Sequence, residues 1–445
     1  MSTLSLRERL ESSPMSPFQW LVVLLCLVLN AVDGLDVMAM AFTATSVSAE
    51  WSLSGAQLGL LLSAGVVGMA LGSVFVAPLA DRFGRRPLLL ASLLVSGAGM
   101  LLSYYSSGPV TLGVLRLITG IGVGVILVGA NVLTSENANA RWRGLAIGLQ
   151  SVGFALGATL GGLLATELNE TLGWRYVFLY GGVITLVAGF VCTLLLPESL
   201  DFLLYKRPRR ALARVNTLLS RMGQAPFEAL PDNRAEIGYT QGYWQLFAPA
   251  QWRTTLLLAL AFFLVMFCFY FVMSWTPKLL AQSGLSASHG IAGGMLLSIG
   301  GMVGALLMGL FASRVSGYRL LFAFLLFTAL LMLAMVPATA LFGLALAVGF
   351  GIGMLLNGAV ASLYTIAPQS YAARLRTSGV GFVIGVGRLG AMASPVVAGM
   401  LLDAEWSPQS LYWLYAAVLL LALLTVQGLQ RLRVRATENP VPNAA

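Results

Sequence analysis

Long apolar runs separated by short polar segments dominate the chain. Twelve of these runs approach or exceed the roughly 20 apolar residues that an α-helix needs to cross a bilayer. The runs do not alternate polar and apolar residues as barrel strands do, and lipid offers no partner to unpaired backbone groups, so they predict helices. They cover residues 18–42, 56–80, 88–105, 110–132, 144–166, 175–196, 253–275, 288–312, 319–337, 339–363, 376–401 and 408–430.

The longest polar interval divides the predicted helices into two groups of six. This interval, 197–252, contains the basic amphipathic stretch "YKRPRRALARVNTLLSRM" and is predicted to be a cytoplasmic linker. Six-helix bundles are then expected at 1–196 and 253–445. A shift of 232 positions places two glycines and an arginine of the first half on the same residue types in the second, namely Gly68, Gly72 and Arg82 on Gly300, Gly304 and Arg314. We therefore predict an all-α membrane protein of two pseudo-symmetric bundles.

Positive charge gathers on one side of the predicted membrane. If the loops are numbered alternately from the N-terminus, all but four of the 26 Lys and Arg residues fall on the side of that terminus; the exceptions are Arg116, Arg175, Lys278 and Arg388. This bias predicts that both termini lie in the cytoplasm and that the protein resides in the inner (plasma) membrane. The first run is too long for a cleaved signal peptide and is read as a retained helix. The net charge of +9 is thus a topology signal, and we expect a lipid bilayer as partner and no nucleic acid.

The residue types needed for catalysis or metal binding are scarce. The three cysteines lie inside predicted spans, and the chain has one His. No metal-ligand spacing and no nucleophile–base pair is found in the spans, so an enzyme is not expected. We expect neither a metal nor a cofactor, and a proton gradient as the energy source.

A polar loop after the second predicted helix reads "APLADRFGRR" and resembles the signature loop of the major facilitator superfamily. The resemblance implies the major facilitator fold and a gating loop formed by Asp81, Arg82, Gly84, Arg85 and Arg86. Asp81 would form a charge latch that breaks and re-forms as the two halves rock. Ala77 stands where the family usually has Gly, which puts a very close helix approach in doubt. The alternative reading is a simple basic loop that sets topology.

Further charges near the cytoplasmic helix ends are candidates for the same gating network. Glu136 and Arg143 flank the loop after the fourth helix, and "PES" follows the sixth. Both resemble major facilitator patterns, which sugar porters share. Arg376 is near the cytoplasmic boundary of the eleventh helix and is read as a gate or anchor residue.

Two carboxylates interrupt the first apolar run in "NAVDGLDVMAM". Asp33-Gly34-Leu35-Asp36 resembles the Asp-Gly-x-Asp signature of the aromatic acid:proton symporter family. The likeness covers nearly the whole chain and extends to "GVLRLITGIGVG", "SWTPKLL" and "RLRTSGVGFVIGVGRLGAMASP". It implies symport of an aromatic carboxylate, such as benzoate or a hydroxybenzoate, with protons.

The positions of these charges agree with proton coupling. Asp33 and Asp36 are three residues apart and share one helix face. Arg116 enters the antiparallel fourth helix about two turns from its outer end, so all three charges are expected at similar depth. One acid would stay ionised beside Arg116 while the other takes a proton. The alternatives are a static ion pair that fixes packing, or a helix end exposed to outer water.

Candidate substrate-binding residues come from several helices. Arg388 lies midway along the eleventh helix, and its guanidinium suits a carboxylate through two parallel hydrogen bonds. Aromatic and polar side chains at comparable depth could hold the ring and its hydroxyl; they are Phe267, Tyr270, Trp275, Gln150, Asn357 and Tyr364.

The sequence therefore predicts a carrier that imports an aromatic carboxylate by alternating access, functional as a monomer. The alternatives are a symporter of a non-aromatic organic acid or sugar, and a sensor or scaffold that binds without transport. The absence of a large extramembrane output domain disfavours the last.

Replacement of Asp36 by Asn is expected to abolish accumulation of substrate driven by a pH gradient, because it removes one of the two carboxylates of the coupling pair. Uptake of radiolabelled aromatic acid with and without a proton uncoupler measures this. Unchanged uphill uptake by the variant would contradict the coupling hypothesis.

Overall fold

Helices account for almost all of the structure. The computed structural model describes residues 13–139, 141–230, 246–249, 251–311, 315–371 and 375–438. Its helices are α2 (Pro17–Glu50), α3 (Gly55–Leu71), the π-helix η1 (Gly72–Val76), the 3₁₀ turn η2 (Ala77–Leu79), α4 (Ala80–Phe83), α5 (Arg85–Ser103), α6 (Pro109–Asn137), α7 (Arg143–Thr171), α8 (Arg175–Leu195), α9 (Leu200–Lys206), α10 (Ala211–Arg221), α11 (Trp252–Gln282), α12 (Ala287–Phe311), α13 (Gly317–Ala338), α14 (Phe342–Gln369), α15 (Arg376–Asp403) and α16 (Pro408–Glu438). Within this described part, twelve helical segments are long and apolar enough to cross a membrane, which confirms the predicted number.

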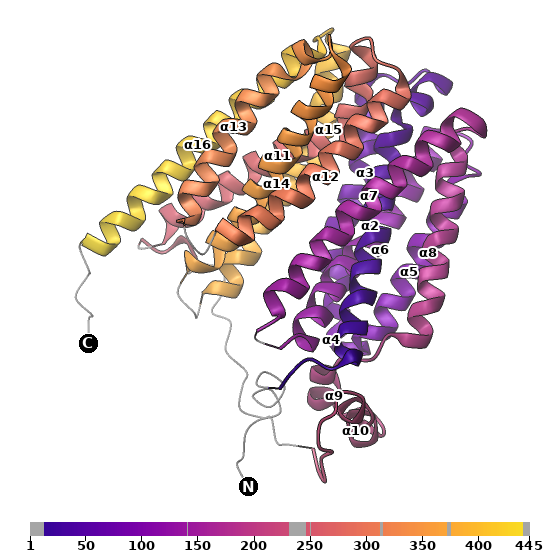
Figure 1. Ribbon diagram of the computed structural model, residues 1–445, viewed down its shortest axis with the longest axis vertical. Coiled ribbons are helices and arrows are strands. Elements are labelled where there is room, and N and C mark those ends of the chain that lie inside the picture. Colours follow the sequence, from indigo (N-terminus) through magenta and orange to yellow (C-terminus); the bar gives the residue numbers. More distant parts are fainter. Residues whose placement is uncertain are drawn as a thin grey trace. The chain divides into compact units, whose positions relative to one another are not determined.

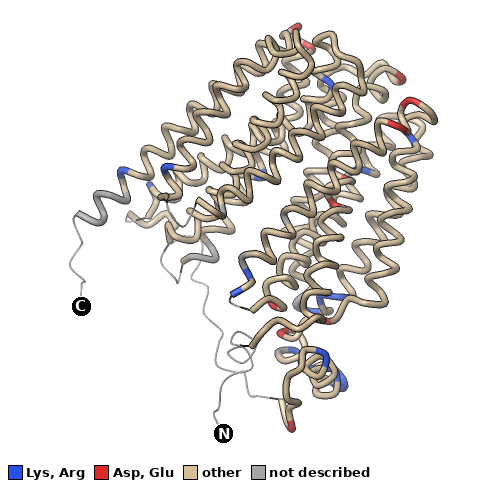
Figure 2. Tube along the Cα trace, in the orientation of Figure 1, with Lys and Arg blue, Asp and Glu red and all other residues tan. Residues whose placement is uncertain are grey.

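Charged residues are rare inside the long helices and frequent at their ends, as Figure 2 shows. Lys and Arg are dense on α9 and α10, which form one end of the first unit defined below (Figures 1 and 2). This distribution is the one that a hydrocarbon layer imposes, because a charge far from water is costly there.

Contacts along the chain define two compact units. Unit 1 comprises Met1–Ala39 and Ala64–Ile237, and unit 2 comprises Met40–Ser63 and Gly238–Ala445. The division differs from a cut at the polar linker, because the end of α2 and the start of α3 pack with helices of the second half. Each unit is described separately below.

In unit 1, α5 packs between α6 and α8 around an apolar core. The core includes Cys26 and Leu29 of α2, Leu93 of α5 and Ile126 of α6, all fully buried. Large side chains fill this side of α2, so its few polar residues project elsewhere.

The opposite side of α2 packs on α7 through glycines. Cβ atoms added at Gly153 and Gly157 would meet the carbonyl oxygens of Leu27 and Ala31, and one added at Gly34 would meet the carbonyl of Phe154. Only glycine permits so close an approach of two backbones. This contact explains why a residue that weakens helices stands between the two aspartates of α2.

The polar linker begins with two short helices that pack on each other. Ser199 caps α9, its Oγ accepting a hydrogen bond from the Phe202 amide at 3.1 Å. α9 and α10 share an apolar cluster that includes Leu203 and Leu219. The helix predicted from the basic amphipathic stretch therefore forms, and its cations lie on the exposed side.

Unit 2 is a helical bundle in which α12 packs against α14 and α11 against α15 (Figure 1). α13 packs on both α14 and α16. Glycines again allow the close contacts, since Cβ atoms at Gly300 and Gly304 of α12 would meet the carbonyl oxygens of Phe350 and Met354. The repeated use of the glycines at 68/72 and 300/304 accounts for the weak sequence repeat.

Gly157→Ala is expected to lower the free energy of unfolding by about 1–3 kcal/mol, because the added methyl group meets the Ala31 carbonyl and the two backbones must separate. Gly148→Ala, on the same helix, is the matched control, since no atom lies within 4 Å of its added Cβ. The control is expected to stay within about 1 kcal/mol of wild type, in the stabilising direction. Thermal unfolding in detergent measures both, and equal effects would refute the packing explanation.

Candidate functional site

The two aspartates and the intramembrane arginine of the first half meet inside unit 1. Arg116 Nη1 lies 2.8 Å from Asp36 Oδ1, and Arg116 Nη2 lies 3.2 Å from Oδ2. Arg116 Nη2 also donates to the backbone oxygen of Asp36 at 2.8 Å. The ring of Phe178, from α8, lies 5.7 Å from the guanidinium carbon. Three hydrogen bonds from the arginine therefore go to one aspartate.

Asp33 has a different environment from Asp36. Asp33 and Asp36 are each 1% exposed and Arg116 is 2% exposed, so all three are shielded from bulk solvent. Neither carboxylate oxygen of Asp33 has a hydrogen-bond partner among the described residues. Because two acids face one arginine, the site carries one negative charge too many unless a carboxyl group is protonated.

The cost of an unpaired buried charge decides which of the two aspartates can change its protonation state. An isolated ionised carboxylate in an apolar interior is strongly unfavourable unless it is paired or neutralised. Asp36 is paired with Arg116, whereas the two oxygens of Asp33 are free to carry a proton. The arrangement can thus hold one permanent ion pair and one exchangeable proton.

The signature loop is held by a carboxylate from the end of α8. Glu198 Oε1 accepts hydrogen bonds from the backbone amides of Arg85 at 2.8 Å and Arg86 at 3.1 Å. Gly84 adopts φ 104°, and a Cβ there would lie 2.6 Å from Glu198 Oε2. The loop therefore needs glycine at this position, both for its backbone conformation and for the approach of Glu198.

Arg85 links this loop to the end of α6. Its guanidinium forms an ion pair with Glu136 and donates to Ser199 Oγ at 3.0 Å. Ser199 in turn donates to Glu136 at 2.7 Å. Three predicted helix ends are thereby joined by one charge network inside unit 1.

The remaining gating candidates take other positions. Arg82 is exposed and lies over the ring of Phe83, and Arg143 Nη2 donates to the Ala138 oxygen at 3.5 Å. The side chains of Asp81 and Arg376 lie outside the described residues. The latch expected of Asp81 therefore stays a prediction.

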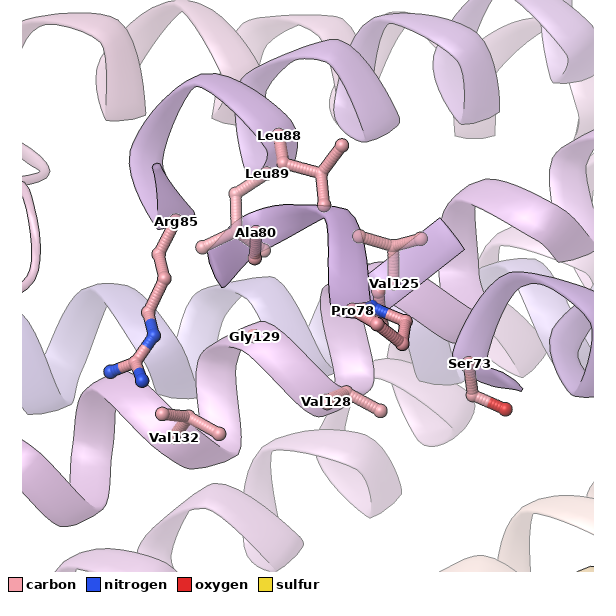
Figure 3. Close-up of a pocket in the computed structure, with 11 residues that line it drawn as sticks. Ser73, Pro78, Ala80, Arg85, Leu88, Leu89, Val125, Val128, Gly129 and Val132 are labelled. Carbon is pink, nitrogen blue, oxygen red and sulfur yellow. The ribbon is translucent and has the colours of Figure 1, made fainter. Parts of the chain in front are cut away.

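A cavity of about 300 Å³ lies beside the signature loop in unit 1 (Figure 3). Its walls come from the end of the second span, α5 and α6, and are mostly apolar. Arg85 and Ser73 lie at opposite ends of the view in Figure 3. The π-helix and the 3₁₀ turn that follow α3 border this space, so the second span is irregular where it approaches the loop.

Three of the predicted substrate-binding residues come together in unit 2. Arg388 of α15 and Tyr270 of α11 lie near the hydroxyl group of Tyr364, from α14. Tyr364 is 41% exposed, and its ring meets that of Phe262 edge to face, with centroids 5.6 Å apart. A cation and two phenol groups can thus approach one small ligand.

The other candidates in unit 2 serve packing in this structure. Trp275 is fully buried and donates its indole N–H to the Pro395 oxygen at 3.1 Å. Phe267 stacks on Tyr415, with centroids 4.9 Å apart. Asn357 donates to its own helix at the Gly353 oxygen, at 3.0 Å. Gln150 belongs to unit 1, where it is buried on α7.

One polar contact of unit 2, made by Asp403, was not predicted from the sequence. Asp403 accepts hydrogen bonds from the Gly55 amide at 2.5 Å and the Ala56 amide at 2.8 Å, at the start of α3. Nearby, Lys278 Nζ donates to Ser48 Oγ at 2.9 Å. Asp403 ends its own helix, where a negative charge is unfavourable because of the helix dipole. This unfavourable position is the sequence feature that could have indicated a partner on another helix.

Comparison with known proteins identifies relatives over the full length. A family model of the Major Facilitator Superfamily matches residues 26–375. The 4-hydroxybenzoate transporter PcaK of Acinetobacter baylyi is 31% identical over 414 residues, covering 91% of this chain and 90% of the relative. The gallate transporter of Pseudomonas putida is 31% identical over 439 residues, covering 98% and 97%. The solved structure of the xylose transporter XylE from E. coli has a TM-score of 0.71 at 16% identity, covering 93% of this chain and 98% of that one, a likeness of fold alone.

Arg116→Ala is expected to destabilise unit 1 by about 3–5 kcal/mol, because it leaves Asp36 buried without its cation. The double variant Asp36→Ala/Arg116→Ala is expected to lose less than the sum of the single losses. A double-mutant cycle of thermal unfolding measures the difference. Arg253→Ala, at an exposed helix start, is the control and should change stability within about 0.5 kcal/mol; additive losses in the cycle would refute the pairing.

Proposed function

Since the chain belongs to the Major Facilitator Superfamily, we propose that it is a proton-coupled importer of aromatic carboxylates of the hydroxybenzoate class. The curated relatives named above are transporters of 4-hydroxybenzoate and gallate. Both compounds carry a carboxylate on a hydroxylated ring. The proposal assigns the same chemical class to this chain.

One observation carries the proton-coupling part of the proposal, namely the unequal environment of two buried acids. Asp36 is held by Arg116 through both carboxylate oxygens, while Asp33 has no partner among the described residues. Asp33 is therefore assigned the transported proton. Asp36 and Arg116 are assigned a fixed role, in which they keep a second charge close to that proton.

The substrate is assigned to the group of Arg388, Tyr270 and Tyr364 in unit 2. A guanidinium binds a carboxylate by two parallel hydrogen bonds, and a phenol can donate or accept a third. Aromatic rings beside it suit a flat aromatic ligand through stacking or edge contacts. Phe267 and Trp275 are not assigned a contact with the substrate, because both are engaged in packing.

Alternating access is supported by the contact between α3 and α15. Asp403 binds amides at the start of α3 through exposed hydrogen bonds. Gly55, Gly59 and Gly399 permit backbone contact between the two helices. We assign this contact to the closed outer end of the carrier. Opening would exchange the Asp403 bonds for bonds to water at small net cost.

The membrane location follows from the charge distribution. The bias of Lys and Arg supports cytoplasmic termini in an inner membrane. We assign the protein a monomeric working state as a separate part of the proposal. Proton import with the acid would then draw on the gradient across that membrane.

Purified protein in proteoliposomes is expected to accumulate 4-hydroxybenzoate when the outside is more acidic, and a proton uncoupler should abolish the accumulation. A panel of benzoate, gallate, muconate and a hexose identifies the substrate class. Accumulation of muconate or hexose without any aromatic acid would reject the proposed substrate.

Asp33→Asn is expected to remove accumulation driven by the pH gradient while flux down a substrate gradient persists, because the amide imitates a permanently protonated acid. Asp36→Asn should impair both modes, since it leaves Arg116 without its carboxylate partner. Uptake at equal and unequal pH measures the two modes. Gradient-driven accumulation by Asp33→Asn would show that the coupling proton binds elsewhere.

A further inference from the structure

Asp33 is the first of three buried polar side chains on α2 and α7 that have atoms without a hydrogen-bond partner among the described residues. Asn30, one turn earlier on α2, is 3% exposed, and its Oδ1 has no hydrogen-bond partner among the described residues. Gln150 of α7 is also 3% exposed, and both Oε1 and Nε2 lack one. A hydrogen bond of 3.2 Å from Asn30 Nδ2 to the Gln150 backbone oxygen joins the two helices.

The packing of α2 on α7 fixes the order of these groups along the bundle. Three contacts, Leu27 with Gly153, Ala31 with Gly157 and Leu35 with Gly161, each join residues 126 positions apart. The helices are therefore parallel. At about 1.5 Å per residue, Asn30 lies about 4.5 Å from Asp33 toward the helix starts. Gln150 lies on the same side of Asp33, because it precedes Phe154, which faces Gly34, by four residues.

The charged neighbour of Asp33 on its other side is engaged. Asp36, one turn toward the end of α2, is bound by Arg116, and these two are the charged groups beside Asp33 in the described part of unit 1. On α7, the residues that face Gly34 are Phe154 and Ala158, which carry no polar side chain. Close to Asp33, the unsatisfied polar atoms of the described residues thus lie toward the helix starts.

Buried polar atoms that the protein leaves unpaired are usually satisfied by internal water. Such a water needs several polar partners, and the amide atoms of Asn30 and Gln150 supply both acceptors and donors. The direction of the series is toward the ends at which α2 and α7 begin, which the charge bias assigns to the cytoplasm.

We propose that Asn30 and Gln150 position a short row of water molecules that carries the proton of Asp33 to the cytoplasmic side. The O–H bond of the Asp33 carboxyl group breaks, the proton passes to the first water, and the last water releases a proton to the cytoplasm. The amides orient the waters and neither gain nor lose protons. Both residues are positioning residues, and the inference rests on the proposed function, in which Asp33 carries the coupling proton.

Two modes of transport separate this role from a structural one. Exchange of labelled for unlabelled 4-hydroxybenzoate at equal pH needs no proton release, because the carrier returns loaded. Net uptake driven by a pH gradient needs release in every cycle. The ratio of net uptake to exchange therefore reports proton release alone.

In proteoliposomes, Gln150→Leu and Asn30→Leu are expected to lower this ratio by about ten-fold or more, because positioned proton transfer contributes about 10²–10⁴-fold and each variant removes part of the positioning. Leu has a similar volume and excludes water. Because both polar ends of Gln150 lack partners, its replacement is not expected to destabilise the fold. Gln150→Asn and Asn30→Ser keep a polar group and should restore most of the ratio.

Gln19→Leu is the matched control, since Gln19 is a buried amide on the same helix whose bonds are all structural. It donates to the Asn137 oxygen and accepts from the Ser16 amide. Its replacement should lower net uptake and exchange together, with an unchanged ratio.

An unchanged ratio in both Leu variants would overturn the inference, and so would an equal loss in the conservative variants. If Gln150 contacted the substrate directly, its replacement would raise the substrate concentration for half-maximal transport equally in both modes. That result would also overturn the inference. Failure of the proposed function appears separately, as wild-type protein that exchanges 4-hydroxybenzoate without responding to the pH gradient, or that does not transport it.

Discussion

The cost of charge inside a membrane helix is the constraint on which the site in unit 1 depends. α2 buries two carboxylates within one turn, and α6 supplies a single guanidinium to neutralise them. Arg116 binds one aspartate by both oxygens, and the other has no hydrogen-bond partner among the described residues. A fixed ion pair and an exchangeable proton can therefore exist side by side.

Glycine makes this site possible by bringing backbones close enough to seal it. Gly34, Gly153 and Gly157 pack α2 onto α7 without side chains between them. The small-residue contact excludes other protein groups from the polar atoms that remain. Packing thus bears on the proposed proton chemistry, since a wider interface would open Asp33 to bulk solvent.

Two polar contacts at helix ends differ in strength and exposure. The network of Arg85, Glu136 and Glu198 ties three helix ends of unit 1 together. The bonds from Asp403 to the start of α3 are few and exposed, and water can replace them.

The sequence by itself determined the fold class and the family. Twelve apolar runs predict twelve helices because hydrocarbon satisfies no backbone group outside a helix or a closed barrel. The family and its class, a transporter and not an enzyme, followed from motifs in the loops and are confirmed by the relatives. The acid pair was also visible, because each charge in such a run is exceptional.

Only the tertiary structure decided how the charges are divided. Sequence spacing placed both aspartates on one face, but which of them Arg116 binds depends on the rotation and depth of α6, which no local pattern encodes. The same holds for Trp275, which is aromatic at the expected depth yet packs against Pro395. Asp403 lies 348 residues from its partner Gly55, so their contact arises from helix packing that hydrophobic periodicity leaves open.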